Sequence, residues 1–219
     1  MDRDYCILRE IYRWRFLLSR HIMDLCGFSG QRATDRRLKI LLEAGYIERN
    51  KILYGIPSLY RLSYKGKILI GVNKRIEKNN IEKIPHDIAV LDTVCYFLKK
   101  YQLKTSDVTS EKELHSADGF GRRSHKPDFV ISLNEKSYAF EVELTLKSKD
   151  RLTSNVKDNY RNYDKQIWIV PKEQMRIIKL LKEFQKSYDG MEILSLKDYI
   201  KGMLKNKINT PIKNPSNMV

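Results

Sequence analysis

Residues 127–144 read PDFVISLNEKSYAFEVEL, and this stretch decides the fold of the second half of the chain. FVISL and YAFEVELT are apolar or alternating runs typical of β-strands, and the NEKS between them is typical of a turn. The stretch therefore predicts a hairpin. Because side chains alternate along a strand, Glu141 and Glu143 share the face opposite the aromatic residues, and an antiparallel partner strand would bring Asp128 alongside them.

Three converging carboxylates need a compensating cation, because crowding or burying like charges costs free energy. Hard oxygen ligands in this arrangement suit Mg²⁺ or Mn²⁺, and such an ion can activate water and neutralise a phosphodiester. We therefore expect a metal site made by Asp128, Glu141 and Glu143, with Asp92 or Glu113 as a further acid. The alternative is a solvated or salt-bridged strand face whose partners are Arg122, Arg123 or Lys126.

The segments around the hairpin predict the order αβββαβαβα, which is an α/β domain with a mixed central sheet. Its first helix covers residues 86–101 and has one apolar stripe at positions 88, 91, 95 and 98. The other predicted elements are a strand at 103–110, a helix at 150–163, a strand at 166–170, a helix at 173–188, a strand at 191–196 and a helix at 197–205. Residues 71–85 are predicted to be a linker, since they are polar and end at Pro85. Residues 206–219 are predicted to be a disordered tail.

The first 70 residues predict three short helices and then a hairpin. Residues 5–18 place apolar side chains on one helical stripe, a second helix runs from Ser19 through Leu25, and a third runs from Ser29 to Gly45. Residues 46–70 hold two β-rich runs around the turn sequence GIPS. The order resembles a winged helix-turn-helix, so we expect an α+β protein with a DNA-binding domain at 1–70, followed by the α/β domain at 86–205.

The third helix is expected to enter a major groove of double-stranded DNA, where polar and basic side chains reach base edges and phosphates. Its outward face presents Gln31, Arg32, Asp35, Arg36 and Lys39. The hairpin would grip the DNA backbone through Arg49, Lys51 and Arg61. The alternative is a winged helix used for protein contacts.

The charge of the chain favours a nucleic-acid partner. The formal net charge is +15 and the pI is near 9.6, which points to a polyanionic partner. The alternative is that the chain comes from a lysine-rich proteome in which many proteins are basic. Up to residue 70 there are 10 Arg and 4 Lys, whereas the remainder has 6 Arg and 22 Lys. Arg has the planar fork that suits phosphate and guanine, so its concentration in the first third supports DNA binding there.

Several classes of protein are not indicated. No stretch approaches the roughly 18 apolar residues of a membrane span, and the start MDRDY lacks a signal-peptide pattern, so we expect a cytoplasmic protein. Cys6, Cys26 and Cys95 lie in apolar helical patterns without a CxxC pair, which indicates buried thiols rather than disulfides or a zinc site.

The residues PD at 127–128 and EVE at 141–143 resemble the PD-(D/E)XK nuclease superfamily over about residues 86–170. The resemblance implies that Asp128 and Glu141 bind metal. It also implies a lysine at the position that Glu143 occupies. Lys147 is the candidate for the missing ammonium, so the catalytic prediction comprises Asp128, Glu141, Glu143 and Lys147. His125 could assist catalysis, but a single histidine in a loop is more often a surface residue.

The longer string EVELTLKSKDRLTSNVKDNY, preceded by TSEKELH and a winged helix, resembles the replication-relaxation family of plasmids and conjugative elements over about residues 5–170. Its matching residues are Thr145, Lys147, Ser148, Arg151 and Tyr160. The resemblance implies a role in replication, mobilisation or its control, with double-stranded DNA and replication or transfer proteins as partners. A homodimer is a further hypothesis, because winged-helix proteins often bind paired half-sites.

Two functions follow from these patterns. The first is a DNA-binding regulator or accessory factor of a mobile element whose nuclease-like domain docks DNA or partners and needs no cofactor. The second is a Mg²⁺-dependent DNA endonuclease targeted by its winged helix. Both bind DNA, and they differ in what Asp128, Glu141 and Glu143 do.

Overall fold

The computed structural model describes residues 2–51, 57–72, 80–118 and 124–196. Four predictions fall wholly or partly outside these ranges. They concern the first half of the GIPS turn, residues 73–79 of the 71–85 linker, the helix at 197–205 and the tail at 206–219. Arg122 and Arg123 also lie outside the described residues.

Three helices and a hairpin form the first part of the chain. The helices are α1 (Asp2–Trp14), α2 (Ser19–Leu25) and α3 (Gln31–Glu43), and the hairpin pairs β1 (Ile47–Asn50) with β2 (Leu59–Leu62) in antiparallel register. The second β-rich run was predicted to reach residue 70, and this is wrong. Ser63 accepts a hydrogen bond from the Gly66 N–H and starts a helix, α4 (Tyr64–Leu69). Gly66 is required there, because a Cβ atom would lie 2.0 Å from the Tyr46 carbonyl oxygen.

A five-stranded sheet forms the second part, and its mixed character confirms the predicted α+β class. The strand order is β3-β4-β5-β6-β7, with β3, β4 and β5 antiparallel and β5, β6 and β7 parallel. The strands are β3 (Val108–Ser110), β4 (Phe129–Leu133), β5 (Lys136–Val142), β6 (Lys165–Val170) and β7 (Met191–Ser195). The helices are α5 (Ile84–Tyr101), α6 (Glu111–Ala117), α7 (Lys149–Asn162) and α8 (Met175–Gln185), with short 3-10 turns at Ile81–Lys83 and Thr105–Asp107.

Helix α6 was not predicted. It begins at a capping box in which Ser110 and Glu113 satisfy each other's backbone N–H groups. The predicted element order therefore lacked one helix, between the first two strands of this part.

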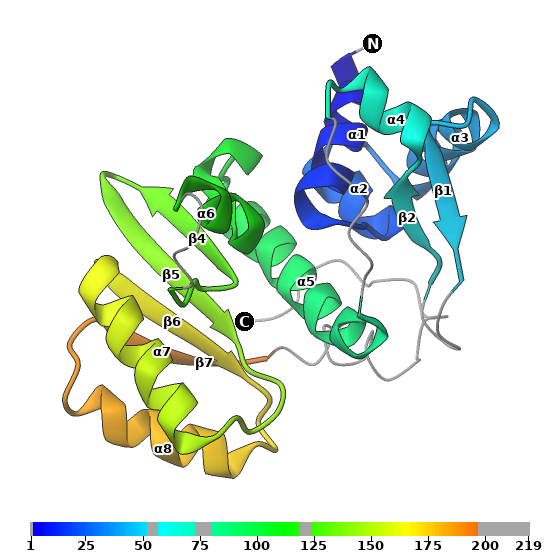
Figure 1. Cartoon of the computed structure of the whole chain (residues 1–219). Helices are drawn as coiled ribbons and strands as arrows, with labels where there is room; N and C mark the ends of the chain where they lie inside the picture. The colour runs from blue at the N-terminus through cyan, green and yellow to red at the C-terminus, as the bar shows by residue number, and fades with distance from the viewer. Residues whose placement is uncertain (1, 52–56, 73–79, 119–123, 197–219) are drawn as a thin grey trace.

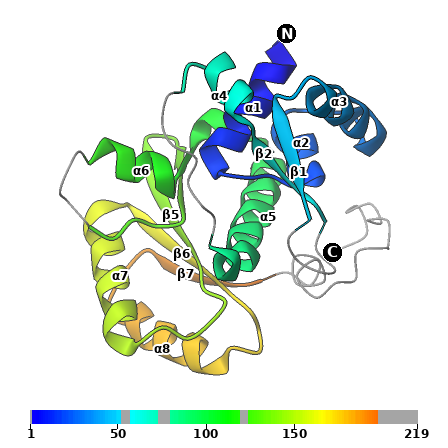
Figure 2. The same cartoon turned by 45° about the vertical axis from the view of Figure 1, so that its right-hand side comes forward.

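Helix α5 differs from the prediction in its start and in its burial. It begins at Ile84 with Pro85 in its first turn, where a missing N–H costs nothing, so the predicted linker boundary falls inside the helix. The single apolar stripe is wrong, because α5 is buried on most of its surface. Figures 1 and 2 show it lying between α1 and α2 on one side and the sheet on the other.

Two apolar clusters cover the two faces of the sheet. The larger cluster runs from α1 and α2 through α5 to Phe140 and Ile167 on the face of the sheet that α5 covers, which we call the near face. The smaller cluster joins α7 and α8 to Trp168 and Val170 on the opposite face. Since both faces are covered, residues 139–142 of β5 are buried, and the Glu141 carboxylate lies against Asn159 of α7. None of the described helices is long and apolar enough to cross a membrane.

Candidate functional site

The β4–β5 hairpin brings Asp128 to the end of β5, as the alternation of the two strands predicted. Phe129 is paired with Phe140, and the Asp128 Oδ2 atom accepts a hydrogen bond of 2.7 Å from the Val142 N–H. Glu141 and Glu143 are the residues before and after Val142 in the sequence. We call Asp128, Glu141 and Glu143 the carboxylate site.

Glu141 is 2% exposed and is held by two donors from different elements. Its Oε1 atom lies 2.6 Å from His125 Nε2 and accepts a 2.9 Å hydrogen bond from Asn159 Nδ2 on α7. Burial raises the pKa of Glu141, and the negative charge of Asp128 raises it further, although both hydrogen bonds act in the opposite direction. The sequence left open whether His125 assists the site or is a surface residue, and in the structure it contacts Glu141 directly.

Lys147 reaches the carboxylate site from the loop before α7. Its Nζ atom lies 2.7 Å from Glu143 Oε2. Burial alone would lower the pKa of Lys147, but Glu143 and the charges of Glu141 and Asp128 raise it, so the side chain is an ammonium ion. Lys147, the candidate for the ammonium group that the motif lysine would supply, therefore lies beside the acids.

His86 is a further partner of the site that sequence reasoning missed. It lies in the first turn of α5, with Nε2 2.9 Å from the Val142 carbonyl oxygen and 3.5 Å from Asp128 Oδ2. Burial alone would lower the pKa of His86, but Asp128 and Asp87 outweigh this and raise it to about 10. The same pairing lowers the pKa of Asp128 despite its burial. No local motif links His86 to a strand so far along the chain, so only the tertiary packing of α5 reveals it.

Each acid of the site thus has its own partner: His86 for Asp128, His125 for Glu141 and Lys147 for Glu143. Within the ranges that the structure describes, no three Asp, Glu, His or Cys side chains are grouped closely enough to hold a metal ion. The donor set itself suits Mg²⁺ or Mn²⁺, and the buried Oδ1 atom of Asn159 has no hydrogen-bond partner among the described residues. For a metal to be held here, the three carboxylates would have to move closer together and exchange His86, His125 and Lys147 for the ion.

The other acids considered from the sequence lie elsewhere. Asp92 faces α2, where it binds Arg20 and His21, and Glu113 binds Arg13 of α1. Lys126 pairs with Asp118 rather than with the carboxylate site.

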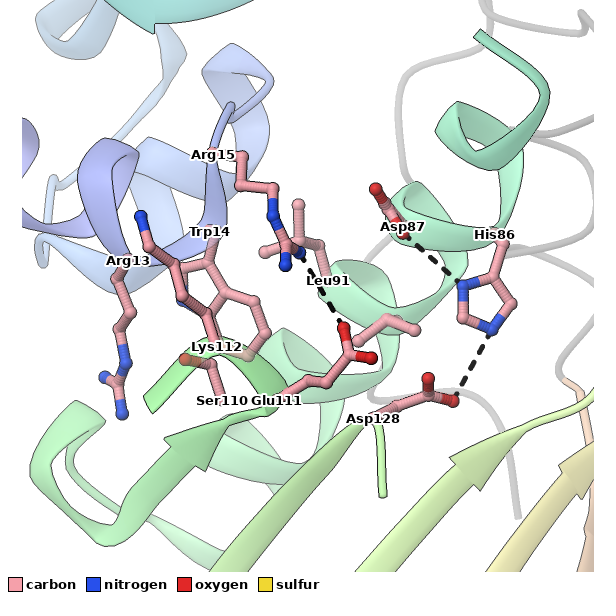
Figure 3. Close-up of a pocket in the computed structure, with 11 residues that line it drawn as sticks. Arg13, Trp14, Arg15, His86, Asp87, Leu91, Ser110, Glu111, Lys112 and Asp128 are labelled. Carbon is pink, nitrogen blue, oxygen red and sulfur yellow. Dashed lines mark hydrogen bonds and ion pairs between the residues drawn. The ribbon is translucent and has the colours of Figure 1, made fainter. Parts of the chain in front are cut away.

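A narrow pocket leads from the first part of the chain to Asp128. Figure 3 shows Trp14, Arg13 and Arg15 at the end of α1 on one side, and His86 and Asp128 on the other. The basic side chains there are occupied: Arg13 binds Glu113 at 2.7 Å, and Arg15 lies 3.8 Å from Glu111.

All five predicted residues of α3 point away from the core, and they differ in how far they are engaged. Gln31 and Asp35 hydrogen-bond to each other and to Ser19, and Lys39 lies 3.8 Å from Glu43. Arg32 and Arg36 form no ion pair or hydrogen bond with any residue that the structure describes. These two guanidinium groups are therefore available to an external anion.

The hairpin residues predicted to contact DNA also differ from one another. Arg49 and Lys51 are exposed, whereas Arg61 is half-buried. Burial lowers the pKa of Arg61, and its Nε atom has no hydrogen-bond partner within the described ranges. Arg61 is thus less open to a phosphate than its neighbours.

A family model with the description replication-relaxation matches residues 8–170. The chain belongs to the replication-relaxation family. The family resemblance predicted from the acidic phrase is confirmed, and its description connects the chain with replication. The residues that match the replication-relaxation family model include α3, the β4–β5 hairpin and Lys147, whereas α8 and β7 lie after the last matched residue. No curated protein and no solved structure matches the chain.

Proposed function

We propose that this replication-relaxation protein binds double-stranded DNA of a plasmid or other mobile element in the cytoplasm and acts in its replication, mobilisation or regulation. The observation that carries the proposal is the pair of unengaged guanidinium groups, Arg32 and Arg36, on the exposed face of α3. An exposed Arg pair one helical turn apart can bind phosphates and base edges together. The net charge of +15 supports a polyanionic partner.

The order of elements supports a winged helix-turn-helix for residues 1–70. Helix α3 follows α2 after a short turn, and its basic face is followed directly by the β1–β2 hairpin. In such a domain the third helix enters the major groove and the hairpin contacts the backbone. Arg49 and Lys51 have the exposure that this role requires.

We propose further that the second domain is a PD-(D/E)XK nuclease-like fold that serves binding rather than cleavage. The hairpin geometry of Asp128 and Glu141 supports the fold. The partners of the three acids support the loss of cleavage, because Lys147, His86 and His125 supply positive charge or donors that a metal would otherwise supply. The neutralised site would then help to dock DNA, or replication and transfer proteins.

A second candidate is an active endonuclease that uses Mg²⁺ or Mn²⁺. The unsatisfied Oδ1 atom of Asn159 favours it, since a buried polar atom without a partner is uncommon and can mark a missing ion or water. When bound, the ion would activate water and offset phosphate charge. Lys147 would then hold its ammonium group beside Glu143 and the developing negative charge.

The DNA-binding proposal is tested by a gel-shift titration of the double variant Arg32→Ala, Arg36→Ala. We expect the variant to bind duplex DNA more weakly and to reduce the slope of log affinity against log salt by about 2, one for each phosphate that is no longer neutralised. The matched control is Arg176→Ala with Lys179→Ala, which removes the same charge from exposed positions on α8. Equal weakening by both variants would mean that only the net charge matters, and it would overturn the assignment of α3.

A further inference from the structure

Cys6 and Cys26 lie side by side in the folded chain. Cys6 belongs to α1, Cys26 directly follows α2, and their Sγ atoms are 2.7 Å apart. Both residues are half-buried, whereas Cys95 is buried inside α5. Sequence reasoning had no basis for pairing them, because twenty positions separate the two residues and no CxxC motif is present.

We propose that Cys6 and Cys26 are a modification site: a dithiol that low-molecular-weight disulfides oxidise to an intrachain disulfide. The bond would fasten α1 to the turn that leads into α3. This proposal does not depend on the DNA-binding function.

The chemistry is two successive thiol–disulfide exchanges. The Cys6 thiolate attacks one sulfur of the oxidant, so a mixed disulfide forms, the S–S bond of the oxidant breaks and one thiolate leaves. Cys26 then loses its proton to solvent and attacks Cys6 Sγ, which expels the second thiolate. The two cysteines lose two electrons, and the oxidant is reduced to two thiols.

The surroundings favour Cys6 as the first nucleophile. The hydrogen bond between the two thiols lowers the pKa of Cys6, and the positive charge of Arg3 acts in the same direction. The same hydrogen bond and burial raise the pKa of Cys26. Cys26 therefore fits the resolving thiol, which attacks only after the mixed disulfide has formed beside it.

The position of the pair explains what the bond would constrain. The Arg3 guanidinium group lies 5.0 Å from the centre of the Phe28 ring, in the turn between α2 and α3. Asp4 forms an ion pair with Arg37 of α3. Helix α1 thus already supports the turn and α3 through non-covalent contacts, and the disulfide would add a covalent tie at the same place.

The test is to incubate the reduced, folded protein with glutathione disulfide, block the remaining thiols with N-ethylmaleimide under denaturing conditions and measure the intact mass. We expect one maleimide on the wild type, at Cys95, and none on the Cys95→Ser variant. Tryptic digestion without reduction should join residues 4–9 to residues 21–32. Three maleimides, or a glutathione adduct that persists on the wild type, would overturn the proposal.

The Cys26→Ser variant is the matched control and should carry no intrachain bond after the same treatment. The oxidised wild type should melt several degrees above its reduced form, because the cross-link restricts the unfolded chain. The Cys26→Ser protein should show no such difference. An equal shift in that variant, or no shift in the wild type, would show that the thiol pair does not constrain α1.

Discussion

Lys147 decides how the carboxylate site is interpreted. Its ammonium group lies 2.7 Å from Glu143, so the site carries a cation of its own at the place where a metal would bind. Glu143 is 2% exposed, and burial raises its pKa although Lys147 acts against this. A buried carboxylate in this position is tolerated because the ammonium group accompanies it.

Removing the ammonium group should therefore make room for a metal. We expect Mn²⁺ at millimolar concentration to leave the melting temperature of the wild type unchanged and to raise that of Lys147→Ala, because a ligand that binds only the folded state stabilises it by mass action. Thermal melting with and without EDTA measures this. A clear increase for the wild type that disappears in Glu141→Ala would show that the native site binds metal despite Lys147.

The interface between α2 and α5 depends on a buried polar group. His21 is 1% exposed and lies between Leu18 and Asp92: its Nδ1 atom accepts a 3.4 Å hydrogen bond from the Leu18 N–H, and its Nε2 atom lies 2.8 Å from Asp92 Oδ1. Burial lowers the pKa of His21, and Asp92 offsets this only in part. An imidazole that accepts a hydrogen bond at Nδ1 must be neutral, so the geometry agrees with this direction.

This interface should weaken in mild acid. Below the unfolded pKa of about 6.5 the unfolded chain takes up a proton that folded His21 does not bind, so the contribution of His21 to stability is lost as the pH falls. We expect the difference in unfolding free energy between the wild type and His21→Gln to shrink from about pH 7.5 to about pH 5.5, by at most about 1.4 kcal/mol per pH unit. Urea titrations at each pH measure this. A difference that stays constant would mean that His21 binds its proton equally in both states.

Elements with a strong local pattern could be predicted from the sequence. The β4–β5 hairpin follows from its alternation and turn, and α3 follows from its apolar spacing and from Gly45 at its end. Tertiary contacts decided the remainder. Helix α5 is buried on most of its surface because it has the sheet on one side and α2 on the other, and His86 meets Asp128 only through that packing. The proximity of Cys6 and Cys26 has the same origin.

One apolar core connects the two parts of the molecule. The larger cluster contains Trp14 and α1 as well as α5 and the near face of the sheet. Polar contacts add to it: Arg20 binds Asp92 through two hydrogen bonds, and Lys99 lies 2.6 Å from Asp24. Because these contacts join α2 to α5, we expect the molecule to unfold as a unit rather than as two independent domains.

The two tryptophans allow a test of this cooperativity. Trp14 lies in the first part and Trp168 in the sheet, so Trp168→Phe and Trp14→Phe leave one reporter in each part. We expect the fluorescence transition of each variant in urea to coincide with its own far-ultraviolet circular dichroism transition. Fluorescence midpoints that differ from the circular dichroism midpoint of the same variant would show separate unfolding of the two parts.

Binding and cleavage of DNA can be tested together in a single plasmid experiment. Supercoiled plasmid is incubated with the wild type and with Glu141→Ala in Mg²⁺ and in Mn²⁺, and each sample is run on a gel before and after removal of protein. For both proteins we expect retarded plasmid before removal and intact supercoiled plasmid afterwards. Nicking or linearisation by the wild type but not by Glu141→Ala would refute the binding-only role of the second domain and establish a metal-dependent endonuclease.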